Sequence, residues 1–250
     1  MMWEITVSES QSKIYCLDYL YQKLSTQVKF VGGIIVKQNF SGRCQLSLAV
    51  PKKQKDYFVL LLLELISEVI TQNYKKEYLS ERIMNITATE LTKTAFIKAL
   101  TVFDKQTDKD LIKKQLVLAS EINIDSFYYF KLQNLRNRWQ EICNLVNENI
   151  SSFDSSRTIK EFLRFLIKAT EVSFDEVHLY KRNQDYYLTD SKNRPITNIC
   201  GCGENGEAGA IEELITLSPA RIVLHGNMPL KDPFYDYIFN LFDDKVYMPI

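Results

Sequence analysis

The sequence predicts an α+β protein with an N-terminal β-α-β-β-α sandwich, a helical middle region and a C-terminal mixed α/β unit with a small sheet. Three observations predict this class. Apolar residues recur at helical spacing in several long segments, and short alternating or β-branched runs lie between them. Hydrophobic residues make up 46% of the 250 positions, which is enough to bury a sizeable core. We expect three domains, over residues 1–85, 86–153 and 154–250.

The first domain is predicted to begin with a strand, "MWEITV", followed by a helix over residues 12–24. Two strands, over 28–39 and 43–51, are joined by "FSGR", a composition that suits a hairpin turn. A long helix is predicted over 55–83, after Pro51. The first helix is inferred from apolar residues at helical spacing, namely Ile14, Leu17, Leu20, Tyr21 and Leu24.

The middle domain reads as mostly helical. Thr87 and Glu90 have the spacing of a capping box, in which the two side chains close the first turn of a helix. The clearest helix is predicted over 127–150, with one buried stripe. Its members are Leu132, Leu135, Trp139, Ile142, Val146 and Ile150.

The C-terminal domain is predicted to start with an amphipathic helix within 153–171. A β-hairpin follows over 175–190, with its turn at Asn183 and Gln184. A helix over 207–217 ends before Pro219, a buried strand covers 220–226, and Pro233 begins a further helix. A closing strand is expected over 245–250.

The charge balance argues against two classes of partner. Lys plus Arg and Asp plus Glu each number 31, so the chain lacks the broad basic field that drives binding to nucleic acids or membranes. The start has no secretory signal, and the apolar run from Tyr57 to Ile66 is about half of the ~20 residues a spanning helix needs. Five cysteines without disulfide-type spacing fit a reducing compartment, so we expect a cytoplasmic protein without a membrane span.

Three segments in the second half of the chain resemble a known family. They are "FYYFKLQNLRNRWQEICNLVNENI", "IKEFLRFLIKATEVSFDEVHLY" and "LITLSPARIVLHG", in this order and at these distances. Together they resemble the YtxC-like family, whose members are soluble sporulation proteins of endospore-forming bacteria. The resemblance covers about residues 127–226 and implies a role in sporulation. It supplies no catalytic residues, and the chain lacks the cysteines with which family members often end.

The segment "CGCGENGEAGA" contains a G-x-G-x-x-G pattern and a Cys-x-Cys pair, but the neighbouring sequence lacks the other features that a nucleotide-binding or a zinc site requires. Gly201, Gly203 and Gly206 form G-x-G-x-x-G, but no buried strand precedes them and the next predicted strand ends in His225 rather than an acid. We therefore expect no bound cofactor, and a loop that leads into the helix from Glu207. Cys200 and Cys202, with His225, are weak candidates for a metal site because a closed zinc site needs a fourth ligand.

The two histidines of the chain are the main candidates for chemistry. His178 and His225 both lie in predicted strands of one small sheet. If those strands are neighbours, the imidazoles could converge, with Asp175, Glu176 or Asp190 orienting them as in a general base or a metal pair. A histidine at the end of a strand also serves simply as a hydrogen-bonded structural residue.

Three functions remain open at the level of sequence. The leading expectation is a sporulation-associated protein that acts through contacts with other proteins, not as an enzyme. The alternative is a small hydrolase or metal-dependent enzyme centred on His178 and His225. The third is a nucleic-acid-binding protein that uses the N-terminal α/β unit and the helix carrying Lys131, Arg136 and Arg138, which the neutral charge disfavours.

Overall fold

The computed structural model divides the chain into two compact units. It describes residues 1–40, 42–83, 86, 88–149, 156–183, 185–196, 206–226 and 232–248. The first unit contains Met1–Glu77 and Lys105–Ile142, and the second contains Tyr78–Asp104 and most of the chain from Cys143 onward. The mixed α/β class is confirmed. The helices of the middle region are shared between the two units.

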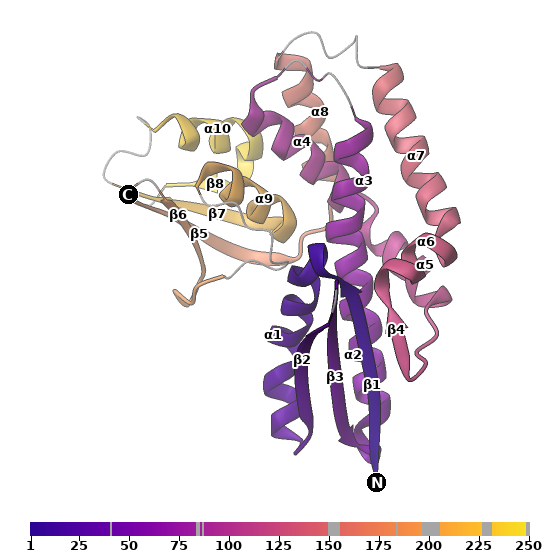
Figure 1. Cartoon of the computed structure of the whole chain (residues 1–250). Coiled ribbons are helices and arrows are strands. Elements are labelled where there is room, and N and C mark those ends of the chain that lie inside the picture. Colours follow the sequence, from indigo (N-terminus) through magenta and orange to yellow (C-terminus); the bar gives the residue numbers. More distant parts are fainter. Residues whose placement is uncertain are drawn as a thin grey trace. The chain divides into compact units, whose positions relative to one another are not determined.

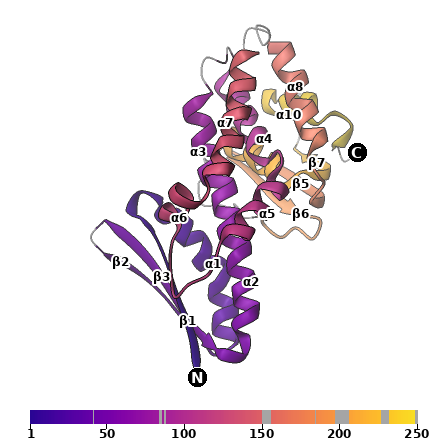
Figure 2. The same ribbon diagram turned by 90° about the vertical axis from the view of Figure 1, so that its right-hand side faces the viewer.

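The first unit is built on a four-stranded sheet. Its strands are β1 (Met2–Ser10), β2 (Ile34–Phe40), β3 (Arg43–Pro51) and β4 (Glu121–Asn123), in the order β2-β3-β1-β4. β1 runs antiparallel to β3 and parallel to β4. Figures 1 and 2 show helices α1 (Ile14–Phe30) and α2 (Lys55–Val69) on one side of this sheet. The predicted β-α-β-β-α order is therefore confirmed.

Two predicted boundaries in this unit were wrong. α1 continues through Phe30, where the sequence predicted a strand, because buried Val28 extends the apolar stripe of the helix by one turn beyond Leu24. The helix predicted over 55–83 is interrupted by a π-helical turn, Ile70–Tyr74, between α2 and α3 (Lys75–Arg82). Every residue of that turn is buried.

From Lys105 onward the chain forms α5 (Lys105–Gln115), β4, α6 (Ile124–Lys131) and α7 (Gln133–Glu148), of which α7 is shared between the two units at Ile142. The single helix predicted from 127 is in fact two, since Leu132 leaves helical geometry with φ −100° and ψ 33°. The strand β4 was not predicted. Of the predicted buried stripe, Leu132, Leu135, Trp139 and Val146 are buried. Ile142 is only partly buried and its neighbour Cys143 is buried instead, while Ile150 lies outside the described residues.

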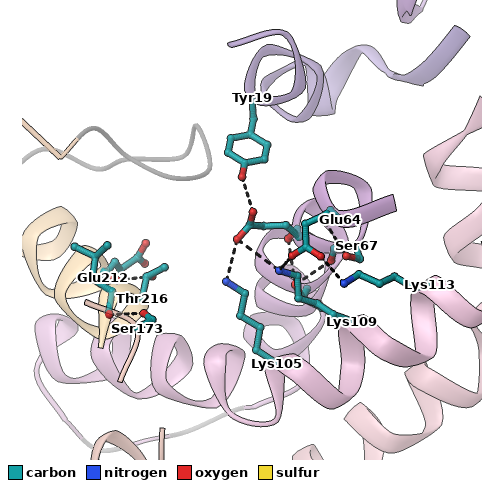
Figure 3. Close-up of polar contacts among 12 residues, drawn as sticks. Tyr19, Glu64, Ser67, Lys105, Lys109, Lys113, Ser173, Glu212 and Thr216 are labelled. Carbon is teal, nitrogen blue, oxygen red and sulfur yellow. Dashed lines mark hydrogen bonds and ion pairs between the residues drawn. The ribbon is translucent and has the colours of Figure 1, made fainter. Parts of the chain in front are cut away.

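Ion pairs join α5 to α2 and to the start of α3. Buried Lys75 donates from Nζ to Asp108 Oδ2 at 2.8 Å, and Trp139 Nε1 donates to the same oxygen at 3.0 Å. Figure 3 shows Lys109 and Lys113 of α5 pointing toward Glu64 of α2. One turn further along α2, Glu68 accepts from Lys105 at 3.0 Å and from the Tyr19 hydroxyl at 2.6 Å.

The second unit contains the predicted small sheet. Its strands are β5 (Phe174–Arg182), β6 (Asp185–Asp190), β7 (Pro219–His225) and β8 (Val246–Tyr247), in the order β6-β5-β7-β8. β5 and β6 form the predicted antiparallel hairpin, with Asn183 at a left-handed φ of 59° in its turn. β7 lies parallel to both β5 and β8.

Besides parts of α3 and α7, the second unit contains the helices α4 (Glu90–Val102), α8 (Ser156–Ala169), α9 (Glu207–Leu217) and α10 (Pro233–Phe242). α4 packs against α8 and α9, and α10 packs against α8. Pro233 begins α10 as predicted. The predicted capping box was wrong, since the cap of α4 is Thr89, whose side chain accepts from the Thr92 amide, and Glu90 is the first helical residue. Short 3-10 turns span Gln11–Lys13, Lys52–Gln54 and Asp243–Lys245.

The helices are also relevant to a membrane location. Across the described ranges, none of the helices has the length and apolarity needed to traverse a bilayer.

Candidate functional site on the second sheet

The period of two along β5 separates its apolar and polar side chains. Val177 and Leu179 are fully buried, whereas Glu176, His178 and Tyr180 alternate with them and project from the opposite face of the sheet. In the parallel register, Tyr180 lies beside His225 of β7. The two predicted strands are thus neighbours, and both histidines lie on one face.

A hydrogen-bonded chain links the two imidazoles to a carboxylate. His178 Nδ1 lies 2.8 Å from His225 Nε2, and His178 Nε2 lies 2.9 Å from Glu176 Oε1. The second carboxylate oxygen of Glu176 lies 3.4 Å from Arg221 Nη1 on β7. Of the three acidic residues considered from the sequence, Glu176 is the one that reaches the histidines.

The rings of this chain are nearly parallel. The planes of His178 and His225 differ by 17°, and their centroids are 5.0 Å apart. Because the two facing nitrogens are only 2.8 Å apart, the rings lie end to end rather than face to face. Tyr180 stacks on His225 with centroids 4.2 Å apart and planes within 10°. The His225 ring is therefore held both by a hydrogen bond along its plane and by an aromatic ring against its face.

This geometry fixes the tautomers of the neutral histidines. An ionised carboxylate only accepts hydrogen bonds, so Glu176 requires a proton on His178 Nε2. Nδ1 of His178 is then an acceptor, and His225 must donate to it from Nε2. The remaining nitrogen, His225 Nδ1, is then unprotonated and has a lone pair that can accept a proton. The chain can therefore take up a proton at His225 Nδ1 and pass the positive charge to His178, beside the carboxylate.

The surroundings of His225 favour its neutral form. Burial lowers the pKa of His225 below its ordinary value, and a positive charge on His178, whenever that ring is protonated, lowers it further. A hydrogen bond from α10 also holds the backbone of His225, because the Tyr235 hydroxyl donates to the His225 carbonyl oxygen at 2.8 Å. Burial raises the pKa of that tyrosine to about 12, so it remains a donor at neutral pH.

The rest of this sheet face carries exposed aromatic and basic side chains. Tyr187 of β6 pairs with Tyr180 in the hairpin register and is 49% exposed. Tyr247 of β8 is 45% exposed, and the guanidinium of Arg221 lies 4.3 Å from its ring centroid. We call these residues, with Glu176, His178, Tyr180 and His225, the histidine face.

Other residues singled out from the sequence do not join this site. Asp175 lies on the opposite face of β5, and Asp190 instead binds the Arg194 guanidinium at 2.7 Å. Arg136 of α7 is occupied within the first unit, where it donates to the Tyr129 carbonyl at 2.7 Å. Within the described ranges, no group of three or more His, Cys, Asp or Glu side chains is arranged to hold a metal ion.

The glycine-rich segment is described only from Gly206, so Cys200, Cys202, Gly201 and Gly203 lie outside the described residues. Gly206 has a left-handed φ of 80° and precedes α9, which begins at Glu207 as predicted.

A second polar cluster, in the first unit, was not predicted. The hydroxyl of Tyr74, in the π-helical turn, lies 2.6 Å from Glu9 Oε2 and 2.8 Å from Asp125 Oδ1. Burial and a hydrogen bond with Asp125 raise the pKa of Glu9 to about 8. Burial alone would also raise the pKa of Asp125, but hydrogen bonds from Glu9 and Tyr74 lower it. Glu9 is thus protonated at neutral pH. Only the three-dimensional fold brings these distant positions together, so no local motif signals the cluster.

Comparison with known proteins identifies a family. A family model described as the YtxC-like family matches residues 60–247, which is most of the chain and includes both histidine strands. No curated protein and no solved structure matches the chain.

Proposed function

This chain belongs to the YtxC-like family, and we propose that it serves in endospore formation by binding another protein through the histidine face. The link to sporulation comes from the family resemblance of the segments around "DEVHLY" and "LSPARIVLHG". Both segments form strands of the sheet that carries this face, β5 and β7.

The single observation that carries the binding role is the composition of the exposed face. Tyr and Arg are the residue types most enriched at the energetic centres of protein interfaces. Tyr187, Arg221 and Tyr247 are each about half exposed, and they lie on three strands of the same sheet, β6, β7 and β8. A rigid sheet presents them without a large loss of side-chain freedom on binding, which favours affinity.

Complementation of a deletion strain tests this role. Deleting the gene is expected to lower the yield of heat-resistant spores, and the wild-type gene should restore it. A variant carrying Tyr187→Ala and Arg221→Ala should accumulate normally but fail to restore the yield. Phe239→Ala is the matched control, because it removes an aromatic ring that is 45% exposed on α10 of the same unit. Full complementation by the double variant would contradict the proposal.

A second candidate function is general-base catalysis, which the Glu176–His178–His225 chain favours. In hydrolysis, His225 Nδ1 would accept a proton from an attacking water, and Nε2 would release its own proton to His178 Nδ1. The imidazolium formed on His178 would be stabilised by the Glu176 carboxylate, 2.9 Å away. The alternation of donors and acceptors in this chain is that of a proton relay.

One substitution separates the two functions. His225→Gln keeps a side chain that can hydrogen bond to His178 but removes the basic nitrogen. If the face only binds a partner, this variant should complement nearly as well as wild type, while the double variant fails. If the site is catalytic, His225→Gln should abolish complementation while the partner still binds.

A further inference from the structure

One end of the first unit combines exposed apolar side chains with an excess of lysines. The end of α1, the start of β2, the end of β3 and the start of α2 all lie there (Figure 1). In the register of the sheet, Met2 lies opposite Pro51 and Ile34 lies opposite Ala49, two residues earlier on the same strand. The Tyr57 hydroxyl donates to Gln27 Oε1 and so ties the start of α2 to the last turns of α1.

Large apolar side chains are exposed across this end. Phe30 at the end of α1 is 90% exposed, and Leu60 on the first turns of α2 is 68% exposed. Ile34 and Met2, on the open side of the sheet, are 63% and 41% exposed, and Tyr57 is 51% exposed. Single exposed apolar residues are ordinary, but five at one end of a unit indicate a surface that binds something apolar.

Four exposed lysines surround these residues: Lys29, Lys52, Lys53 and Lys55. Asp56 is the one acidic residue in the segments 27–34 and 51–60 that supply these lysines. Exposed Glu4 of β1 flanks Ala49 on the side opposite Ile34, so the four lysines outnumber the two acidic residues at this end. In the part of the chain that the structure describes, no carboxylate forms an ion pair with any of the four. In contrast, Lys13, Lys37, Lys75, Lys105, Lys109 and Lys113 of the same unit are all ion-paired. The chain as a whole has zero net charge, but this end of the first unit has a local excess of positive charge. We call these lysines and the five apolar residues the basic tip.

We propose that the basic tip docks the protein on an anionic lipid surface. Apolar side chains at the tip would enter the boundary between headgroups and acyl chains, while the lysines would contact lipid phosphates. Tyr57 has the amphipathic ring that favours this boundary. Nucleic acid is the weaker occupant. Phe30 and Tyr57 carry rings that could stack on bases, but the exposed aliphatic side chains Met2, Ile34 and Leu60 cannot stack and suit a lipid boundary.

The charges and apolar residues supply two separable contributions. A lysine near an anionic surface is worth about 1 kcal/mol, which corresponds to about fivefold in the partition constant. Removing two lysines should therefore weaken binding by roughly 25-fold. Raising the salt concentration should also weaken binding of the wild type, because salt screens the attraction between the lysines and the anionic lipids. Removing exposed Phe30 and Leu60 should weaken binding at every salt concentration.

Vesicle co-sedimentation of the full chain tests the proposal, with phosphatidylcholine vesicles that contain or lack 30% phosphatidylglycerol. The wild type should bind the anionic vesicles and leave the neutral ones. Lys53→Gln with Lys55→Gln, and separately Phe30→Ser with Leu60→Ser, should each reduce that binding at least tenfold. The matched control is Lys131→Gln with Lys114→Gln, which removes the same charge within the first unit at positions outside the segments that form the tip.

Several results would overturn the proposal. One is that the wild type fails to bind anionic vesicles at low salt, and another is that it binds neutral vesicles equally well. A third is that the control variant loses as much vesicle binding as the variants of the tip. A fourth is that the wild type binds RNA through the tip lysines without binding vesicles. Circular dichroism and unfolding midpoints of all variants should match the wild type, because every substituted side chain is exposed. The outcome is independent of the histidine face, whose residues stay intact throughout.

Discussion

Lys75 and Asp108 form an ion pair that is almost completely removed from solvent, with side chains 0% and 2% exposed and 2.8 Å between Nζ and Oδ2. The pair joins α3 to α5 inside the first unit. Trp139 donates to the same carboxylate oxygen at 3.0 Å, so α7 is held by the same group. A single carboxylate thus links three helices.

Removing that carboxylate is expected to destabilise the first unit strongly. Asp108→Ala removes the carboxylate that lies 2.8 Å from the buried Lys75 ammonium, and breaking a buried ion pair in this way costs about 3–5 kcal/mol in the free energy of unfolding. Urea unfolding followed by Trp139 fluorescence measures this loss. Asp110→Ala on the same helix is the control, since Asp110 is exposed and should change stability by less than about 0.5 kcal/mol. Replacing both partners, with Lys75→Met and Asp108→Leu, should recover much of the loss.

The Glu9 carboxyl should make stability fall as pH rises from about 4.5 to about 8. Burial keeps Glu9 protonated in the folded state up to about pH 8, whereas the unfolded chain releases that proton near pH 4.5. Below 4.5 both states hold the proton, so this contribution to stability is complete there. Between the two values it is lost by up to about 1.4 kcal/mol per pH unit.

Glu9→Gln should therefore flatten that slope and stabilise the protein at pH 8. The amide keeps a donor for Asp125 and an acceptor for Tyr74 without carrying a charge. Chemical unfolding at a series of pH values tests this, with Glu4→Gln on the exposed part of β1 as the control. A slope that persists in the Glu9 variant would rule out Glu9 as its source.

The turn between α1 and β2 should distinguish two neighbouring glycines. A β-carbon on Gly33 would lie 2.7 Å from the Ala49 carbonyl oxygen and 3.0 Å from that of Val28, and neither backbone atom can move easily. Gly33→Ala should cost about 1–3 kcal/mol or more through overpacking. Gly32 has a left-handed φ of 73° with open space around it, so Gly32→Ala should cost about 1 kcal/mol through backbone strain alone. Thermal unfolding of the two variants should show the larger loss for Gly33.

The tautomers of the histidine chain are open to direct measurement. Nitrogen NMR of the imidazole rings should show protonated Nε2 on both His178 and His225, and an unprotonated Nδ1 on His225. The His225 signal should titrate below its ordinary pKa. Glu176→Gln allows the amide to donate to His178 Nε2, so the proton of His178 can move to Nδ1 and the pattern should change. An unchanged pattern would mean that Glu176 does not set the tautomers.

Much of the fold could be predicted because its helices have continuous apolar stripes. The stripe at Leu17, Leu20 and Leu24 identified α1, but its length was underestimated because Val28 also suits a strand. The strand β4 has three residues, too few to show alternation, and its partner β1 lies more than a hundred positions earlier. Non-local pairing of this kind leaves no local pattern.

The candidate site could be predicted only in part. The sequence predicted that His178 and His225 lie in strands of one sheet. Whether the two rings meet depends on β7 lying next to β5, and the sequence alone did not predict that strand order. Glu176 shares the parity of His178 along β5 and Asp175 does not, so alternation alone favoured Glu176. Tyr180 has the same parity and was overlooked. Arg221 required the register between the two strands.

The parallel pairing of Thr6 with Glu121 bears on how the polypeptide acquires its structure during synthesis. During translation β1 leaves the ribosome long before β4 has been synthesised. The edge of β1 that pairs with β4 therefore stays unpaired during that time. Contacts so distant along the chain slow folding, and unpaired strand edges invite association with other chains. Translation of residues 1–85 alone would produce a sheet without its final strand. Such a fragment is expected to aggregate, whereas a chain extended past residue 142 can complete that sheet.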